Sequence, residues 1–371
     1  MIDRDEFSAW LRLLETPGVG RTAARALLAH FASPEAVIGA STAARSAVVP
    51  ASVAAALAAT PPDFDIRLAA GWRWLGSGGD EPRDAIAIGD PRYPSALLDS
   101  PDPPLLLYAR GRFAPLQAPA IAIVGSRNPT PQGLENARAF AAHLASAGWV
   151  VVSGLALGID GAAHEGALAG GGTTIAVVGT GLDLDYPTRH RALARRIAAG
   201  GVVVSEFAIG TPALAANFPV RNRIIAGLAR GTLVVEAALQ SGSLITARLA
   251  AEAGREVFAI PGSIHTPQAR GCHALIRQGA KLVDSAADIV DELAPLYPAA
   301  RTSRPEPAAA APPARKDPVL DALGHDPIDL EALVDRTGRS AAELAARLLE
   351  LELEGRVARL PGQRFQRVER A

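Results

Sequence analysis

The sequence predicts an α/β protein whose central part is a doubly wound parallel sheet. Between residues 119 and 293, short apolar runs alternate with helical patterns about seven times, as expected of βαβ units. Turns rich in glycine and serine follow most of these runs, at the points where parallel strands end and ligands bind. The expected strands, in chain order, are Ala120–Val124, Val150–Ser153, Thr174–Val178, Val202–Ser205, Thr232–Glu236, Glu256–Ala259 and Lys281–Val283.

Residues 1–75 are predicted to form a helical domain. Apolar residues recur there at helical spacing, and the segment Thr16–Gly20 separates two such patterns. Helices joined by a Pro-Gly-Val-Gly turn form a helix-hairpin-helix element, whose second helix offers backbone N–H groups to a DNA phosphate. Secondary DNA contacts are therefore predicted at Gly18, Gly20 and Arg21. The alternative is a plain helical hairpin whose glycines only form the bend.

Two further apolar runs precede the central region. Ala85–Ile88 and Leu105–Tyr108 are predicted strands, and the prolines between them exclude a long helix. The second run is either an edge strand or a cover for the sheet that follows.

The first central strand leads into a candidate anion site. The turn 125–127 follows Ala120–Val124, and Thr130 with Pro131 can cap and begin a helix. Such a turn exposes backbone N–H groups, the helix dipole adds partial positive charge, and Arg127 adds a planar set of donors. An ordinary strand-to-helix turn with an exposed arginine is the competing interpretation.

Small residues and arginines also follow the other central strands. Three arginines at this rim can neutralise a polymer backbone, and Phe218 offers a ring on which a base can stack. The predicted DNA-binding residues are Gly125, Ser126, Arg127, Ser153, Gly154, Phe218, Arg221, Asn222, Arg223, Ser241, Gly242 and Ser243. The alternatives are more ordinary. Phe218 can be a core residue, Asn222 can cap a helix Arg223–Arg230, and the two arginines beside it can pair with Glu206 or Glu236.

No catalytic residue and no metal or cofactor site is predicted. A Gly-x-Ser-x-Gly elbow is absent, and Glu236 is expected to make a structural hydrogen bond. Asp160 and His164 share one helix face, where an Asp cap beside a helical histidine is favoured over an acid–base pair. His265 and His273 lie near Cys272 at a spacing that matches no metal site.

The composition of the chain limits which functions and locations it can have. The chain has 371 residues, enough for two or three domains, and 37 basic against 38 acidic side chains. Nucleic-acid binding must therefore depend on locally clustered arginine rather than on bulk charge. A single cysteine excludes a disulfide framework and a cysteine zinc site. The acidic N-terminus and the lack of a long apolar segment predict neither a signal peptide nor a membrane span, hence a cytoplasmic protein.

The C-terminal region is predicted to be a winged-helix module. A Pro/Ala-rich linker at 297–317 separates it from the central domain, 84–296. Residues 318–371 read as three helices, Val319–Leu323, Ile328–Asp335 and Ser340–Leu353, then a hairpin of Arg356–Leu360 and Arg364–Val368. The third helix is acidic and the hairpin is basic. We therefore expect this module to dock a protein, or to touch nucleic acid only through its wing.

The motifs of the central region together resemble one family, DNA-processing protein A, also called Smf. The matching segments are GSRNPT (125–130), SGLALGIDGAAH (153–164), TIAVVGTGLD (174–183), SE (205–206), FPVRNRIIAGL (218–228), VVEAALQSGSLITA (234–247), GREVFAIPG (254–262) and LIRQGA (275–280). YPSALLDSPDPPLLLYARG (93–111) is similar to the family's entry segment. Two departures stand out: Ala213–Asn217 lacks a lysine that many members have there, and Cys272-His273 replaces an expected Thr-Asn type pair.

The resemblance implies a fold and a function. The central domain would be an extended Rossmann-like fold that binds single-stranded DNA, between a helix-hairpin-helix or SAM-like domain and a winged helix. Members protect incoming single strands in natural transformation, load the RecA recombinase and dimerise through the Rossmann domain, and no catalytic activity is attached to them. Two other hypotheses stay open: a nucleotide-binding or nucleotide-processing Rossmann enzyme or sensor, and a duplex-DNA regulator using the two terminal modules.

Overall fold

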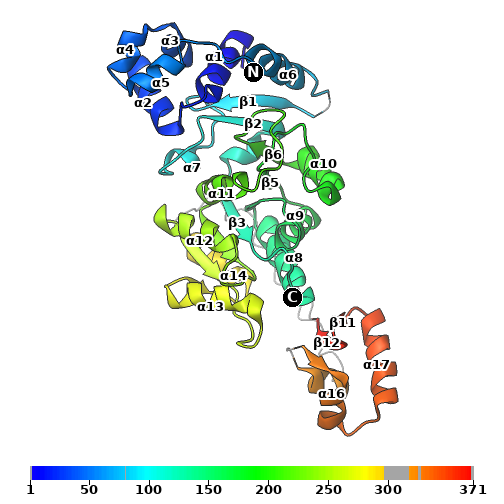
Figure 1. Cartoon of the computed structure of the whole chain (residues 1–371). Helices are drawn as coiled ribbons and strands as arrows, with labels where there is room; N and C mark the ends of the chain where they lie inside the picture. Colours follow the sequence, from blue (N-terminus) through cyan, green and yellow to red (C-terminus); the bar gives the residue numbers. More distant parts are fainter. Residues whose placement is uncertain (1, 80, 296–316, 325–326, 369–371) are drawn as a thin grey trace. The chain divides into compact units, whose positions relative to one another are not determined.

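The computed structural model describes residues 2–79, 81–295, 317–324 and 327–368 (Figure 1). Two compact units make up the chain. The first combines Met1–Ala118 with Thr174–Leu228, and the second combines Pro119–Thr173 with Ala229–Ala371. All but the last residue of the predicted linker 297–317 lies outside the described residues. No helix among the described residues is both long and apolar enough to cross a bilayer.

The N-terminal part of the first unit is helical, as predicted. Its helices pack around Phe7, Leu13 and Leu27, all fully buried. Gly18 has a φ of 86°, and the N–H of Val19 donates to the carbonyl of Thr16 at 3.1 Å, which closes the tight turn of the predicted hairpin. The helices are α1 (Arg4–Glu15), α2 (Arg21–Phe31), α3 (Pro34–Gly39), α4 (Thr42–Ser46), α5 (Ala51–Ala56) and α6 (Phe64–Gly76).

The sheet of the first unit is partly antiparallel. Its order is β1-β2-β6-β5, with strands β1 (Arg83–Ala87), β2 (Leu106–Gly111), β5 (Thr174–Val177) and β6 (Val202–Ser205). β1 pairs antiparallel with β2 and β2 antiparallel with β6, whereas β5 and β6 are parallel. The sequence predicted that the second apolar run is either an edge strand or a cover for the sheet. Both alternatives are wrong, because β1 is the edge strand and β2 is an interior strand. The helical segments are α7 (Ser95–Leu98), η1 (Ala114–Gln117), η2 (Thr188–His190), α10 (Arg191–Gly200) and α11 (Asn217–Leu228).

The strands of the second unit confirm the predicted parallel arrangement. They lie in the order β4-β3-β7-β8-β9, and the ladders given for β3 with β4, β3 with β7, β7 with β8 and β8 with β9 are parallel. Fully or almost fully buried residues such as Trp149, Ile121 and Phe258 fill the core under the helices. The strands are β3 (Ala120–Val124), β4 (Val150–Ser153), β7 (Gly231–Val234), β8 (Glu256–Ala259) and β9 (Lys281–Leu282). The helical segments are α8 (Pro131–Ser146), α9 (Ile159–Ala169), α12 (Ser243–Glu252), η3 (Pro267–Ala269), α13 (Arg270–Arg277) and α14 (Ala286–Leu293).

The C-terminal module has the predicted winged-helix arrangement. Its elements are α15 (Pro318–Leu323), β10 (Ile328–Asp329), α16 (Leu330–Thr337), α17 (Ala341–Leu353), β11 (Val357–Leu360) and β12 (Arg364–Arg367). The predicted second helix was wrong at its start, because Ile328 pairs with Phe365 in the small sheet and Asp329 caps α16. Ser340 and Glu343 form the capping box of α17.

Candidate nucleic-acid interface

The turn after β3 leads into a capped helix. Thr130 caps α8, because its hydroxyl accepts the N–H of Gly133 at 3.0 Å, and Pro131 occupies the first helical position. Arg127 is exposed in the turn that enters this helix. The predicted cap is confirmed, and the start of α8 has the partial positive charge of a helix N-terminus.

Two glycines allow the turns after β3 and β4 to pack closely. A Cβ on Gly158, whose φ is 82°, would lie 2.4 Å from the carbonyl oxygen of Ser126. A Cβ on Gly125 would lie 2.7 Å from Cγ1 of Ile159, whose own N–H donates to Ser126 at 3.1 Å. The backbone that carries Arg127 is therefore held by packing that only glycine permits.

Glu236 stabilises the same turn. Its carboxylate accepts the N–H of Thr130 at 2.9 Å and the hydroxyl of Thr130 at 2.6 Å. Its carbonyl accepts the N–H of Ser126 at 2.7 Å. Burial raises the pKa of Glu236, and the two hydrogen bonds from Thr130 oppose that rise. The structural role expected for Glu236 is confirmed.

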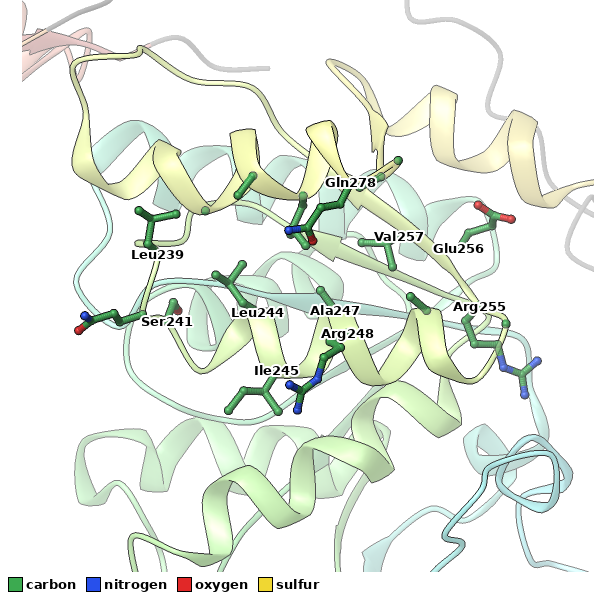
Figure 2. Close-up of a pocket in the computed structure, with 18 residues that line it drawn as sticks. Leu239, Ser241, Leu244, Ile245, Ala247, Arg248, Arg255, Glu256, Val257 and Gln278 are labelled. Atoms are coloured by element: carbon green, nitrogen blue, oxygen red, sulfur yellow. The ribbon is translucent and has the colours of Figure 1, made fainter.

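The predicted serines of the second unit differ in accessibility. Ser153 is fully buried, and its hydroxyl donates to the carbonyl of Ile123 at 2.6 Å, while Gly154 is also buried. The hydroxyls of Ser241 and Ser243 lie 2.6 Å apart at the start of α12, where Gly242 is the N-cap. Ser241 is half-buried and lines an open groove of about 750 Å³ along α12, β8 and α13. Figure 2 shows Ser241 beside Leu239, at one end of the row of labelled residues.

In the first unit, the N-terminus of α11 carries an aromatic pair. The ring of Phe218 lies 5.6 Å from the ring of Tyr186, and Tyr186 is 47% exposed. The guanidinium carbon of Arg221 lies 5.9 Å from the centre of the Phe218 ring, which is cation–π distance. Asn217 donates to the carbonyl of Gly179 at 3.1 Å and so fixes α11 on the turn after β5. Half-buried Phe218 is therefore at the carboxyl end of β5 rather than in the core.

Arg221 is 4% exposed and binds protein groups. Its guanidinium donates to the carbonyl of Val177, the last residue of β5, and to the side-chain oxygen of Asn222 at 3.1 Å. The expected cap at Asn222 was wrong, because α11 begins at Asn217 and Asn222 lies inside it. Arg221 thus ties α11 to a strand end, since a buried guanidinium needs acceptors.

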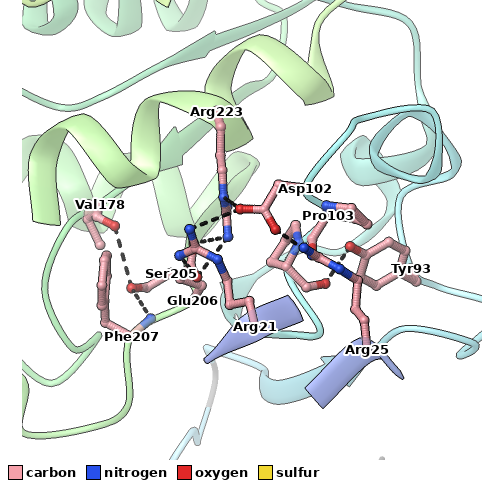
Figure 3. A network of polar contacts seen from close by, with 11 residues as sticks. Arg21, Arg25, Tyr93, Asp102, Pro103, Val178, Ser205, Glu206, Phe207 and Arg223 are labelled. Carbon is pink, nitrogen blue, oxygen red and sulfur yellow. Dashed lines mark hydrogen bonds and ion pairs between the residues drawn. The ribbon is translucent and has the colours of Figure 1, made fainter. Parts of the chain in front are cut away.

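Arg223 is 9% exposed and lies in an acidic setting. Its Nε donates to Asp102 at 2.9 Å, and its Nη2 lies 2.6 Å from Glu206 Oε2 (Figure 3). The predicted alternative of an ion pair with Glu206 is confirmed. The predicted alternative partner Glu236 is instead bound to Thr130.

The N-terminal hairpin joins this network. Arg21 lies 2.9 Å from Asp102 and 3.5 Å from Glu206, and Arg25 also pairs with Asp102. Gly18 and Gly20 are exposed in the turn just before Arg21. Three arginines surround two carboxylates, so the cluster carries one net positive charge. Arg21 therefore links the helical domain to β6 and α11 within the first unit.

The pKa values of the two carboxylates in the cluster are shifted in opposite directions. Burial raises the pKa of Glu206, and the charges of Arg223 and Arg21 only partly offset this. Burial also acts to raise the pKa of Asp102. There the hydrogen bond from Arg25 and the charges of Arg223 and Arg21 outweigh it, and the pKa of Asp102 falls below its ordinary value. The deeper burial of Glu206 explains the difference.

Sequence reasoning missed Tyr186 and Asp102. The Tyr-Pro pair at 186–187 was visible after a predicted strand, and an aromatic residue at a strand end is a signal for base stacking. Asp102 lies in the segment DSPDPP, where nothing indicates a partner 121 residues further along the chain.

The described residues contain no group of three His, Cys, Asp or Glu side chains that could hold a metal ion. The expected Asp160 cap was wrong in position, since Gly158 is the N-cap of α9. Asp160 lies in the first turn, and its carboxylate accepts the N–H of Ala156 at 3.3 Å. His164 is fully buried. Cys272 is also fully buried, with its sulfur 3.6 Å from the carbonyl of Val234.

Comparisons with known proteins agree on one family. Residues 84–294 match the model of DNA recombination-mediator protein A, and residues 303–363 match the DprA winged helix domain. Protein Smf of Escherichia coli (strain K12) is 44% identical over 277 residues, which cover 73% of this chain and 74% of that protein. DNA processing protein DprA of Streptococcus pneumoniae is 48% identical over 208 residues, covering 56% of this chain and 73% of that protein.

Solved structures lead to the same conclusion. The X-ray structure of DNA processing protein A from Streptococcus pneumoniae has a TM-score of 0.64 at 36% identity, covering 77% of this chain and 97% of that one. A structure describing the single-stranded DNA binding mode of DNA processing protein A from Helicobacter pylori has a TM-score of 0.53 at 31% identity, with 58% and 97% covered. The chain therefore belongs to the family of DNA recombination-mediator protein A, whose members are named DprA and Smf.

Proposed function

We propose that this protein binds single-stranded DNA without catalysing a reaction on it. The relative from Helicobacter pylori is described as binding single-stranded DNA, and this chain shares its fold at 31% identity. The observation that carries the proposal is the Tyr186–Phe218 pair with Arg221 beside it. Two aromatic rings at a strand end, one of them exposed, suit unpaired bases, because stacking needs a base face that a duplex hides.

Within this proposal, the predicted residues have different roles. Arg127, which is exposed in the turn after β3, binds phosphate through its planar guanidinium. Phe218 stacks on a base, and Ser241 offers a hydroxyl to the backbone. Arg221 and Arg223 are positioning residues, because their guanidinium groups are bound by Val177, Asp102 and Glu206. Asn222 is assigned to holding the guanidinium of Arg221. The remaining predicted contacts are assigned to shaping the turns: Gly125, Ser126, Ser153, Gly154, Gly242 and Ser243.

The test is a titration of fluorescent oligothymidylate by anisotropy, across roughly 0.05 to 0.3 M salt. Arg127→Ala is expected to weaken binding and to reduce the salt slope by about 0.7, the value for one phosphate contact on a single strand. Arg73→Ala is the matched control, since Arg73 is also exposed but lies on α6. Equal affinities of Arg127→Ala and wild type at matched salt would refute the assignment of Arg127.

The finer parts of the function are also proposals. Family resemblance supports loading of RecA onto the bound strand in natural transformation, a homodimer formed through the Rossmann domain, and a cytoplasmic location. Light scattering after gel filtration tests the dimer by its mass. RecA loading is tested by whether the protein speeds RecA filament formation on strands coated with single-strand binding protein.

No observation favours the competing nucleotide enzyme. A glutamate after a strand and a Ser-Gly-Ser turn at a helix start are compatible with such an enzyme, but the carboxylate of Glu236 accepts two hydrogen bonds from Thr130. A thermal-shift comparison separates the two functions, because mononucleotides would stabilise an enzyme whereas only oligonucleotides would stabilise a strand binder.

A further inference from the structure

Helix α10 of the first unit carries a basic face with no assigned role. Arg191, Arg195 and Arg196 are exposed on it, and Arg189 is exposed just before it. Its opposite face packs Leu193, Ala194, Ile197 and Ala198 against the unit's strands (Figure 1). The helix contains no Asp or Glu, and its other exposed residues are Ala192 and Ala199. No acidic side chain of the helix itself therefore lies beside these guanidinium groups.

Most of these arginines are available for a ligand. Within the described part of the chain, no hydrogen bond or ion pair involves the side chains of Arg189, Arg195 or Arg196. Arg191 alone is paired, with its Nε 2.8 Å from Asp185. A surface with several unpaired cations and no acid of its own has the character of a polyanion-binding surface.

The basic face is continuous with the candidate site of the same unit. Asp185, which pairs with Arg191, precedes Tyr186, and the ring of Tyr186 contacts Phe218. At the other end of the helix, the N–H of exposed Arg112 donates to the carbonyl of Gly201, the C-cap of α10, at 2.7 Å. The basic residues thus run from Arg191, whose partner Asp185 adjoins Tyr186, along α10 to Arg112 beside its C-cap.

We propose that this face is a second contact surface for the same DNA strand, on which Arg195, Arg196 and Arg112 bind phosphates of nucleotides beyond the Tyr186–Phe218 pair. The inference depends on the proposed binding of single-stranded DNA and extends it to longer strands. Ten helical residues span about 15 Å, the length of roughly four stacked nucleotides. Guanidinium groups without base-reading partners bind the backbone independently of sequence.

The test compares a short and a long oligothymidylate of roughly 6 and 20 nucleotides. The variant is Arg195→Ala/Arg196→Ala, and its control is Arg4→Ala/Arg73→Ala, which removes the same charge from exposed positions on α1 and α6. The α10 variant should bind the long strand about 5- to 30-fold more weakly, with a salt slope lower by about 1.4. Its affinity for the short strand should equal that of the wild type. Arg195→Lys/Arg196→Lys should restore most of the loss, because it restores the charge.

The possible outcomes distinguish failure of the proposed function from failure of the second contact surface. If the wild type binds neither oligonucleotide, the proposed function fails, and this inference fails with it. If it binds both and the α10 variant matches the control on the long strand, only the second surface is wrong. If the variant loses duplex binding but keeps binding of the long single strand, the surface belongs to duplex DNA and the inference is overturned. Both variants change exposed side chains only, so unchanged thermal unfolding confirms that folding is not the cause.

Discussion

The ring of Tyr186 lies 5.6 Å from the ring of Phe218, with the two planes inclined by 34°. Tyr186 comes from the loop after β5 and Phe218 from the first turn of α11, so two separate segments build one aromatic surface. Arg221 lies against Phe218 and is itself bound to the end of β5. Phe218 is thus held in place before any strand binds, which lowers the entropy cost of stacking.

Replacing either ring should therefore weaken binding of single strands. Phe218→Ala and Tyr186→Ala are each expected to lower affinity about 5- to 150-fold, because one stacked base contributes about 1–3 kcal/mol. Tyr186→Trp, which keeps a ring, should bind as the wild type does. Anisotropy titrations measure the affinities, and urea unfolding shows whether Phe218→Ala also loses stability. A Tyr186→Ala variant of full affinity would contradict the stacking role.

Gly158 should be intolerant of any side chain. Gly158→Ala would place a Cβ 2.4 Å from the carbonyl oxygen of Ser126 at a φ of 82°. Gly171→Ala is a close control, because Gly171 has a φ of 73° and open space around it. We expect the control to lose about 1 kcal/mol from backbone strain alone and Gly158→Ala about 2–4 kcal/mol. Urea unfolding measures both, and similar losses would mean that the turns can separate without cost.

The winged-helix module should touch DNA only through its hairpin. Arg356 and Arg359 lie on the hairpin side of the module, whereas α17 carries Glu343, Glu350 and Glu352. In the full chain, Arg356→Ala/Arg359→Ala is expected to lower affinity for duplex DNA about 3- to 10-fold and to reduce its salt dependence. Gel-shift titration at two salt concentrations measures this. Tight duplex binding that survives the double substitution would assign the contact to another surface.

The sequence predicted the strands better than the arginines. The bounds of β3, β4, β6 and β8 agree with the apolar runs, because a buried parallel strand is a continuous apolar segment. Arg223, in contrast, was assigned to an open rim and lies between Asp102 and Glu206. Its environment depends on a contact across 121 residues that no local pattern encodes. The sequence offered Glu206 as an alternative partner for this guanidinium, but nothing in it indicated Asp102.

The same cluster gives two pH dependences of opposite sign. The pKa of Asp102 is lowered in the folded chain, so its contribution to stability is present above its unfolded pKa of about 3.9 and is lost as pH falls through the folded value. The pKa of Glu206 is raised, so its contribution is complete below its unfolded pKa of about 4.3 and is lost as pH rises through the folded value.

Asp102→Asn should therefore cost about 1–3 kcal/mol near pH 7, because Arg21, Arg25 and Arg223 lose a charged acceptor, and the cost should shrink as pH falls below about 4. Relative to Glu206→Gln, the wild type should instead gain stability as pH falls from 7 toward about 4. Urea unfolding of the three proteins at matched ionic strength measures both differences. If both differences changed in the same direction with pH, the two carboxylates would share one environment, and burial of Glu206 could not be what separates them.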